Sequence, residues 1–162
     1  MPNYSSRKVT FENAEGRKLS GRMEFPADQH PFAFVIFAHC FTCSKNLGAV
    51  RNISRALTSH GFGVLRFDFT GLGESEGDFA DTTFSSNVQD LVAASHFLEE
   101  EYQAPALLIG HSLGGAAVIY AAAELEAAKA VVTIGAPADP EHVSHLLEGG
   151  LDQLEEQGEA EV

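Results

Sequence analysis

A serine between two glycines is the feature of this sequence that most directly suggests chemistry. The pattern Gly-x-Ser-x-Gly runs from Gly110 to Gly114, with Ser112 at its centre. A serine hydroxyl becomes an acyl-transferring nucleophile when a nearby base takes its proton. In that role the pattern needs a strand immediately before it and a helix immediately after it, because the turn between them exposes the hydroxyl at the end of a sheet.

Both flanking elements are predicted here. A four-residue apolar run, 106–109, precedes the motif, and an Ala-rich stretch, 113–128, follows it. The two glycines fit so sharp a turn, because side chains at their positions would collide with neighbouring backbone. Ser112 would then stand at the N-terminus of a helix, whose N–H groups favour developing negative charge. An inert serine in a Gly-tolerant turn is the weaker interpretation.

The rest of the chain alternates between strand and helix patterns. Two short strands, 9–11 and 18–25, flank a turn and predict an antiparallel hairpin. Nearly continuous apolar runs are typical of parallel strands covered on both faces, and they occur at 32–38, 62–68, 106–109 and 130–134. Helical periodicity occurs at 46–59, 86–101 and 113–128, and a further helix is predicted from 142 to 147. Ser86 and Gln89 have the spacing of a capping box.

Three loop motifs together resemble the α/β-hydrolase superfamily. They are 38–42 (AHCFT), 67–75 (FDFTGLGES) and 110–115 (GHSLGG). The resemblance extends from about residue 17 to residue 147, and it is greatest to serine hydrolase domains often fused ahead of a domain like osmotically inducible protein C. It implies an α/β fold: a three-layer α/β-hydrolase core with a mostly parallel sheet and an N-terminal antiparallel hairpin. It also implies that Ser112 cleaves small carboxylic esters through an acyl-enzyme, without a cofactor.

The same resemblance implies an oxyanion hole. The backbone N–H of Leu113, directly after the nucleophile, would be one donor, and the N–H of Phe41 would be the other. Many relatives have glycine where this chain has Cys40. The loop 68–77 is expected to shape the edge of the site without a catalytic role.

The acid and the histidine of a serine hydrolase follow the serine in this fold, at the ends of two further strands. No apolar strand is predicted after residue 134, so the core is expected to lack its last strands. Two interpretations stay open. Either the acid and the histidine lie beyond residue 162, or a reduced site uses Asp139 with His142 or His145. We favour the simpler view that both histidines lie on a helix surface.

Two alternatives to a hydrolase deserve weight. Cys40 and Cys43 form a C-x-x-C before a predicted helix, which could carry thiol–disulfide chemistry. Two cysteines cannot build a disulfide framework, so we expect a cytoplasmic protein with reduced thiols. The other alternative is a catalytically impaired hydrolase fragment that serves as a binding or assembly module.

Charge and composition restrict the partners. Of 162 residues, 23 are Asp or Glu and 10 are Lys or Arg, for a net charge of −13. Nucleic acid and anionic membrane surfaces need a basic patch, so neither is an expected partner. No signal peptide is visible, and no apolar run approaches the ~18 residues of a membrane span. No metal site is predicted, because His142 and His145 would supply two ligands at most.

The predicted domain organisation is a core over 1–149 and an acidic tail over 150–162. If the sheet ends at the strand 130–134, that strand is an apolar edge without the charges that normally block edge pairing. The sequence therefore predicts a homodimer or higher oligomer that covers this edge.

Overall fold

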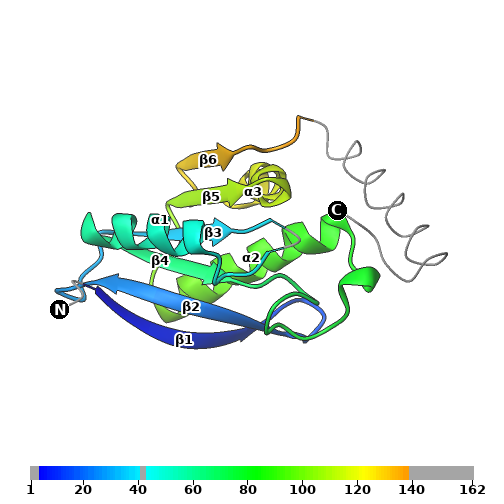
Figure 1. Ribbon diagram of the computed structural model, residues 1–162, viewed down its shortest axis with the longest axis horizontal. Coiled ribbons are helices and arrows are strands. Elements are labelled where there is room, and N and C mark those ends of the chain that lie inside the picture. Colours follow the sequence, from blue (N-terminus) through cyan, green and yellow to red (C-terminus); the bar gives the residue numbers. More distant parts are fainter. Residues whose placement is uncertain (1–3, 41–42, 139–162) are drawn as a thin grey trace.

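The fold is built on a single mixed sheet. A computed structural model describes residues 4–40 and 43–138, and its six strands lie in the order β1-β2-β4-β3-β5-β6 (Figure 1). The strands are β1 (Tyr4–Glu12), β2 (Lys18–Pro26), β3 (Ala33–Ala38), β4 (Phe62–Phe67), β5 (Leu107–His111) and β6 (Ala130–Ile134). Strand β2 pairs antiparallel with both β1 and β4, whereas β4, β3, β5 and β6 run parallel to one another. The predicted mostly parallel sheet with an N-terminal hairpin is confirmed.

Helices cover both faces of this sheet. They are α1 (Gly48–Ser59), α2 (Phe84–Glu101) and α3 (Leu113–Glu124), together with a short 3₁₀ helix η1 (Phe79–Asp81). Alternate residues of β3 point to opposite faces, so Val35 and Phe37 pack with Val50 of α1. On the other face Ile36 packs into a larger core with Leu91 of α2 and residues of α3. The three-layer α/β arrangement is therefore confirmed.

The start of α2 differs from its predicted form. The N-cap is Thr83, and the side chain of Ser86 binds the Thr83 N–H while the Thr83 hydroxyl accepts from the Ser86 N–H. The predicted capping box of Ser86 with Gln89 is therefore wrong. The helix begins at Phe84, two residues earlier than predicted, because Thr83, in extended backbone geometry, already accepts the Ser86 N–H with its side chain.

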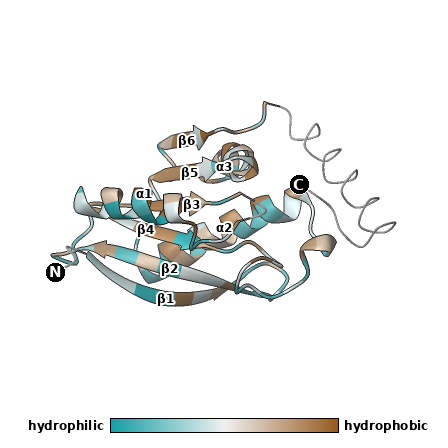
Figure 2. Cartoon of the chain, viewed as in Figure 1, coloured by the Kyte–Doolittle hydropathy of each residue, from teal (hydrophilic) through white to brown (hydrophobic). Residues whose placement is uncertain are grey.

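Strand β6 lies at the edge of the sheet that the described residues form. All five of its residues are exposed, and Val131, Val132 and Ile134 are large and apolar. The hydropathy colouring of β6 runs from white to brown (Figure 2). Helix α3 contacts β6. The predicted exposed edge is therefore present within residues 4–138.

Several predictions fall outside the described residues. The helix predicted from 142, the tail over 150–162 and the core boundary at 149 all belong to residues 139–162. In the part of the chain that is described, no helix is both long enough and apolar enough to cross a bilayer.

Candidate active site

Ser112, the predicted nucleophile, occupies the turn that joins β5 to α3, which is named the nucleophile turn after this prediction. Its backbone has φ 53° and ψ −125°, and Gln29 is the one other described non-glycine residue with positive φ. The Ser112 N–H donates to the Ile134 carbonyl over 2.8 Å, and the Ser112 carbonyl accepts from the Gly115 N–H over 2.8 Å. These bonds hold Ser112 in a conformation that L-residues avoid. The predicted sharp and strained turn is confirmed.

The two glycines of the motif are required for the predicted reason, because side chains at their positions would collide with neighbouring backbone. A Cβ at Gly110 would lie 2.3 Å from the Gly114 carbonyl oxygen. A Cβ at Gly114 would lie 2.4 Å from the His39 carbonyl oxygen and 2.7 Å from that of Ala38. Such approaches exclude any side chain, so both positions require glycine for space alone. The first turn of α3 therefore rests directly on the loop that follows β3.

Leu113 begins α3, and its N–H has no hydrogen-bond partner among the described residues. The first N–H groups of a helix lack intrahelical acceptors and carry partial positive charge. An N–H directly after Ser112 can therefore bind an anionic oxygen. The second predicted donor, Phe41, lies outside the described residues.

His39 organises the loop after β3. Its imidazole is fully buried, with Nδ1 2.5 Å from the Cys40 carbonyl oxygen and Nε2 3.6 Å from Oδ1 of Asp68. Burial lowers the pKa of His39 below its usual value, against the opposite effects of the Cys40 carbonyl and the Asp68 carboxylate. A neutral imidazole with its Nδ1–H donated to Cys40 is locked in place, so it is poorly suited to act as a base for Ser112.

The predicted acid and base are not among the described residues. Asp139, His142 and His145 all lie in 139–162. Within residues 4–40 and 43–138, the Ser112 hydroxyl forms no hydrogen bond, and neither His39 nor His111 reaches it. The nucleophile turn is therefore assembled in the described chain without a base.

Cys40 and Cys43 are joined by a disulfide, with their Cα atoms 5.3 Å apart. This corrects the expectation of reduced thiols. The turn brings the two residues together, because the Cys43 N–H donates to the Cys40 carbonyl over 3.0 Å. The pair lies in the loop after β3, beside the first turn of α3.

A buried group of charged side chains lies beside this loop, and it was not predicted from the sequence. It consists of Glu24, Lys45, Arg66 and Asp68, joined at the surface by Glu74. The available signal was a charged residue inside each of two apolar strands, Glu24 in β2 and Arg66 in β4. Their pairing became visible only with the β2–β4 register.

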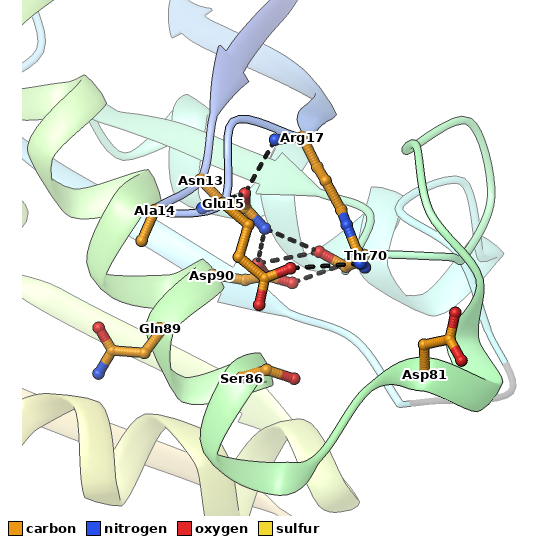
Figure 3. A pocket seen from close by; sticks show the side chains of 9 residues that line it. All are labelled: Asn13, Ala14, Glu15, Arg17, Thr70, Asp81, Ser86, Gln89 and Asp90. Atoms are coloured by element: carbon orange, nitrogen blue, oxygen red, sulfur yellow. Dashed lines mark hydrogen bonds and ion pairs between the residues drawn. The ribbon is translucent and has the colours of Figure 1, made fainter.

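A cavity of about 110 Å³ lies away from the nucleophile turn, under the β1–β2 hairpin (Figure 3). The buried carboxylate of Asp90 accepts from the side chain of Asn13 and from the N–H and hydroxyl of Thr70. Burial raises the pKa of Asp90 above its usual value. These bonds satisfy the carboxylate without a ligand. Among the described residues, no three His, Cys, Asp or Glu side chains are placed to hold a metal ion.

Comparisons with known proteins agree with this geometry. The family of serine aminopeptidases, S33, matches residues 29–152. The esterase domain of a Rhodothermus marinus protein is 56% identical in a match that covers 88% of this chain and 57% of that one, with a TM-score of 0.72. The Pyrococcus furiosus esterase Pf2001 shares the fold at 24% identity and a TM-score of 0.78, over 92% of this chain and 59% of that one.

A curated relative is the monoglyceride lipase of Rattus norvegicus, 30% identical over 137 residues. The match covers 76% of this chain but 44% of the relative, so the chain spans less than half of that protein's length. The family match covers most of the chain and includes the nucleophile turn, the loop after β3 and the strands that carry them. The chain therefore belongs to the serine aminopeptidase S33 family of α/β-hydrolases.

Proposed function

We propose that this protein is a serine hydrolase that cleaves small carboxylic esters through an acyl-enzyme on Ser112. The observation that carries the proposal is the backbone of Ser112, at φ 53° between β5 and α3. A non-glycine residue in that region costs on the order of 1–3 kcal/mol, and such strain concentrates at functional sites. Glycine would fit this turn better, so the serine is retained for its hydroxyl.

In the proposed reaction, Oγ of Ser112 attacks the ester carbonyl carbon and a base takes its proton. The tetrahedral oxyanion is stabilised by the N–H groups of Leu113 and Phe41, and its collapse expels the alcohol with that proton. Water then cleaves the acyl-enzyme. The Leu113 N–H has no partner among the described residues, which supports this role because no hydrogen bond within them must break before it binds an oxyanion.

The base is proposed to come from the chain that follows β6. Ile134 accepts the hydrogen bond of the Ser112 N–H, so the chain leaves β6 directly beside the nucleophile turn. Asp139 with His142 or His145 can form such a site. The alternative is an acid and a histidine supplied by a longer protein that contains this sequence.

Two relatives support an ester as substrate. One is described as an esterase domain, and the other is a monoglyceride lipase, whose name states an ester substrate. The family description names aminopeptidases instead, so amide cleavage is the specific competitor. A small ester has the better leaving group, and a minimal site with a weak base cleaves it more readily than an amide.

The test is covalent labelling of the protein with a fluorophosphonate, followed by peptide mass spectrometry. We expect the label on Ser112 and none in S112A. Turnover of p-nitrophenyl acetate should exceed that of an aminoacyl p-nitroanilide. Loss of labelling in H142Q or H145Q would identify the base, and retention in both would favour a base from a longer chain. If the parent protein shows no labelling and no turnover, the result would favour a binding or assembly module.

The Cys40–Cys43 disulfide favours a second candidate, thiol–disulfide exchange. The pair lies shortly before α1, where a helix N-terminus can stabilise a thiolate. An insulin-reduction assay with dithiothreitol tests it against the variant C43S. Turbidity no faster than with dithiothreitol alone would exclude this activity.

We also propose that two copies associate through β6. Its five exposed residues are apolar apart from Thr133, and it carries no charged side chain that would oppose pairing. Pairing of two such edges in a two-fold dimer would extend the sheet across both copies.

A further inference from the structure

Charged side chains are buried where the loops after β3 and β4 meet. Lys45 and Asp68 are each about 1% exposed at the side chain, and Arg66 and Glu24 are almost as inaccessible. Burying charge is costly unless each group is paired and hydrogen-bonded. Apolar residues would fill this space at a lower cost in desolvation free energy. The positions that these charges impose on the chain therefore need an explanation.

Asp68 joins the two loops through a single carboxylate. Its Oδ1 accepts the backbone N–H of Lys45 over 2.7 Å, and its Oδ2 accepts the backbone N–H of Glu74 over 3.0 Å. The Lys45 ammonium also binds Oδ2. A Cβ at Gly73 would lie 2.4 Å from this carboxyl group, so the loop after β4 is wrapped tightly around Asp68.

Arg66 holds the opposite side of the same residue. Its guanidinium donates to the backbone carbonyl of Lys45 and is itself fixed by Glu24, with Nη2 2.8 Å from Oε1. Both backbone groups of Lys45 are therefore bound by side chains at the end of β4, although Lys45 belongs to no helix or strand. The buried side chains of Asp68 and Arg66 thus bind the backbone of Lys45, as backbone hydrogen bonds do in a helix or a strand.

The described residues on either side of 41–42 are both held by their surroundings. On one side, His39 packs against the backbone of Gly114, and its imidazole faces Asp68. On the other side, Asp68 and Arg66 bind the backbone of Lys45. Asp68 is thus common to Lys45 and to the residue that packs on the first turn of α3.

We propose that Asp68 and Arg66 are positioning residues for the reaction at Ser112, because both hold Lys45 and Asp68 also faces His39, whose backbone packs on the first turn of α3. This inference rests on the proposed function, in which Phe41, between His39 and Lys45 in the sequence, is one oxyanion donor. Neither side chain touches the substrate. An oxyanion donor acts only at the correct distance, so loosening His39 and Lys45 lowers transition-state stabilisation more than substrate binding.

The experiment compares D68N with D90N. Both replace a buried carboxylate that accepts a backbone N–H, but the hydrogen bonds of Asp90 go to Thr70 and Asn13 and not to His39 or Lys45. We expect D68N to lower kcat for p-nitrophenyl acetate by about 10²-fold, the size of losing one oxyanion donor, with KM changed by less than about threefold. D90N should leave kcat within about threefold. Equal losses in the two variants, at equal folded fractions, would overturn the proposal.

Amide hydrogen exchange supplies a readout that needs no activity. In D68N, peptides covering residues 43–47 should exchange at least about tenfold faster while those of α2 stay unchanged, because Asp68 accepts the Lys45 N–H, and D90N should leave 43–47 unchanged. If D68N does not fold, R66K is measured in the same two ways, because lysine cannot bind Glu24 and the Lys45 carbonyl together as the guanidinium fork does. Unchanged exchange overturns the positioning role, whereas absent labelling of Ser112 in the parent protein overturns the proposed function alone.

Discussion

His39 and Gly114 touch through their backbones, because a Cβ at Gly114 would lie 2.4 Å from the His39 carbonyl oxygen. No side chain separates the loop after β3 from the first turn of α3. A change in either element must therefore move the other, and the position of Ser112 depends on both. This contact makes the second glycine of the motif a packing requirement as well as a signature.

The first prediction concerns the two glycines of the nucleophile turn. We expect G110A and G114A each to lower the free energy of unfolding by about 2–3 kcal/mol, because the added methyl must displace backbone rather than a flexible side chain. Urea unfolding followed by circular dichroism measures the loss.

The matched control is G48A, at the first residue of α1. A Cβ there meets no atom within 4 Å, and the residue has no positive φ. We expect a gain of about 0.5 kcal/mol, because alanine restricts the unfolded chain and favours the helix. If G114A were as stable as G48A, the close contact between His39 and Gly114 would be wrong.

The second prediction separates the strain at Ser112 from its chemistry. Both S112G and S112A should abolish labelling by a fluorophosphonate. S112G should be more stable than S112A by about 1 kcal/mol, because glycine adopts φ 53° without a steric penalty.

The control for this comparison is an exposed position inside α1, Ala56. There A56G should be about 1 kcal/mol less stable than the parent, because glycine is disfavoured in a helix. Glycine should therefore be the more stabilising of the two residues at position 112, and alanine at position 56. If the alanine variant were the more stable one at both positions, the backbone of Ser112 would not be strained.

The motif, the strands and the glycines were predictable because each depends on local spacing. The turn at Ser112 follows from glycines two residues away on either side, and β3 follows from an uninterrupted apolar run. The group around Asp68 was not predictable in this way. Glu24 and Arg66 are 42 residues apart and meet only because β2 and β4 pair antiparallel, which sequence spacing does not reveal.

The disulfide and the start of α2 show the same limit at shorter range. Composition alone favoured reduced thiols, whereas the turn that pairs Cys40 with Cys43 depends on the course of the backbone after β3. For α2, Ser86 fits two capping boxes by spacing, and the extended backbone of Thr83 decides between them.

The third prediction concerns pH. Burial lowers the pKa of His39 from its model-compound value of 6.5, so the folded protein binds this proton more weakly than the unfolded chain does. Stability is therefore complete above about pH 6.5 and falls as the pH drops below it, by at most about 1.4 kcal/mol per pH unit. Urea unfolding at about pH 7.5 and 5.5 measures the change.

H39Q should flatten this dependence, because glutamine does not titrate. The exposed His60 provides the control, since H60Q should keep the slope of the parent protein. A slope that is equal in the parent and in H39Q would show that other groups cause the loss of stability.

The fourth prediction tests association through β6. Val132 lies in the centre of this strand and is 44% exposed, so a lysine there can be solvated in a monomer but not in a paired edge. We expect V132K to weaken the dimer at least about tenfold in sedimentation velocity, because it places like charges close to each other across a two-fold axis.

Phe32 supplies the control for that experiment. It is 65% exposed and packs on Phe62 near the start of β3, at the opposite end of the parallel strands from the nucleophile turn. F32K removes more exposed apolar surface than V132K and adds the same charge, so a general effect of charge or hydrophobicity would weaken both variants alike. Selective loss in V132K supports pairing through β6. A parent protein that sediments as a monomer at micromolar concentration would exclude it.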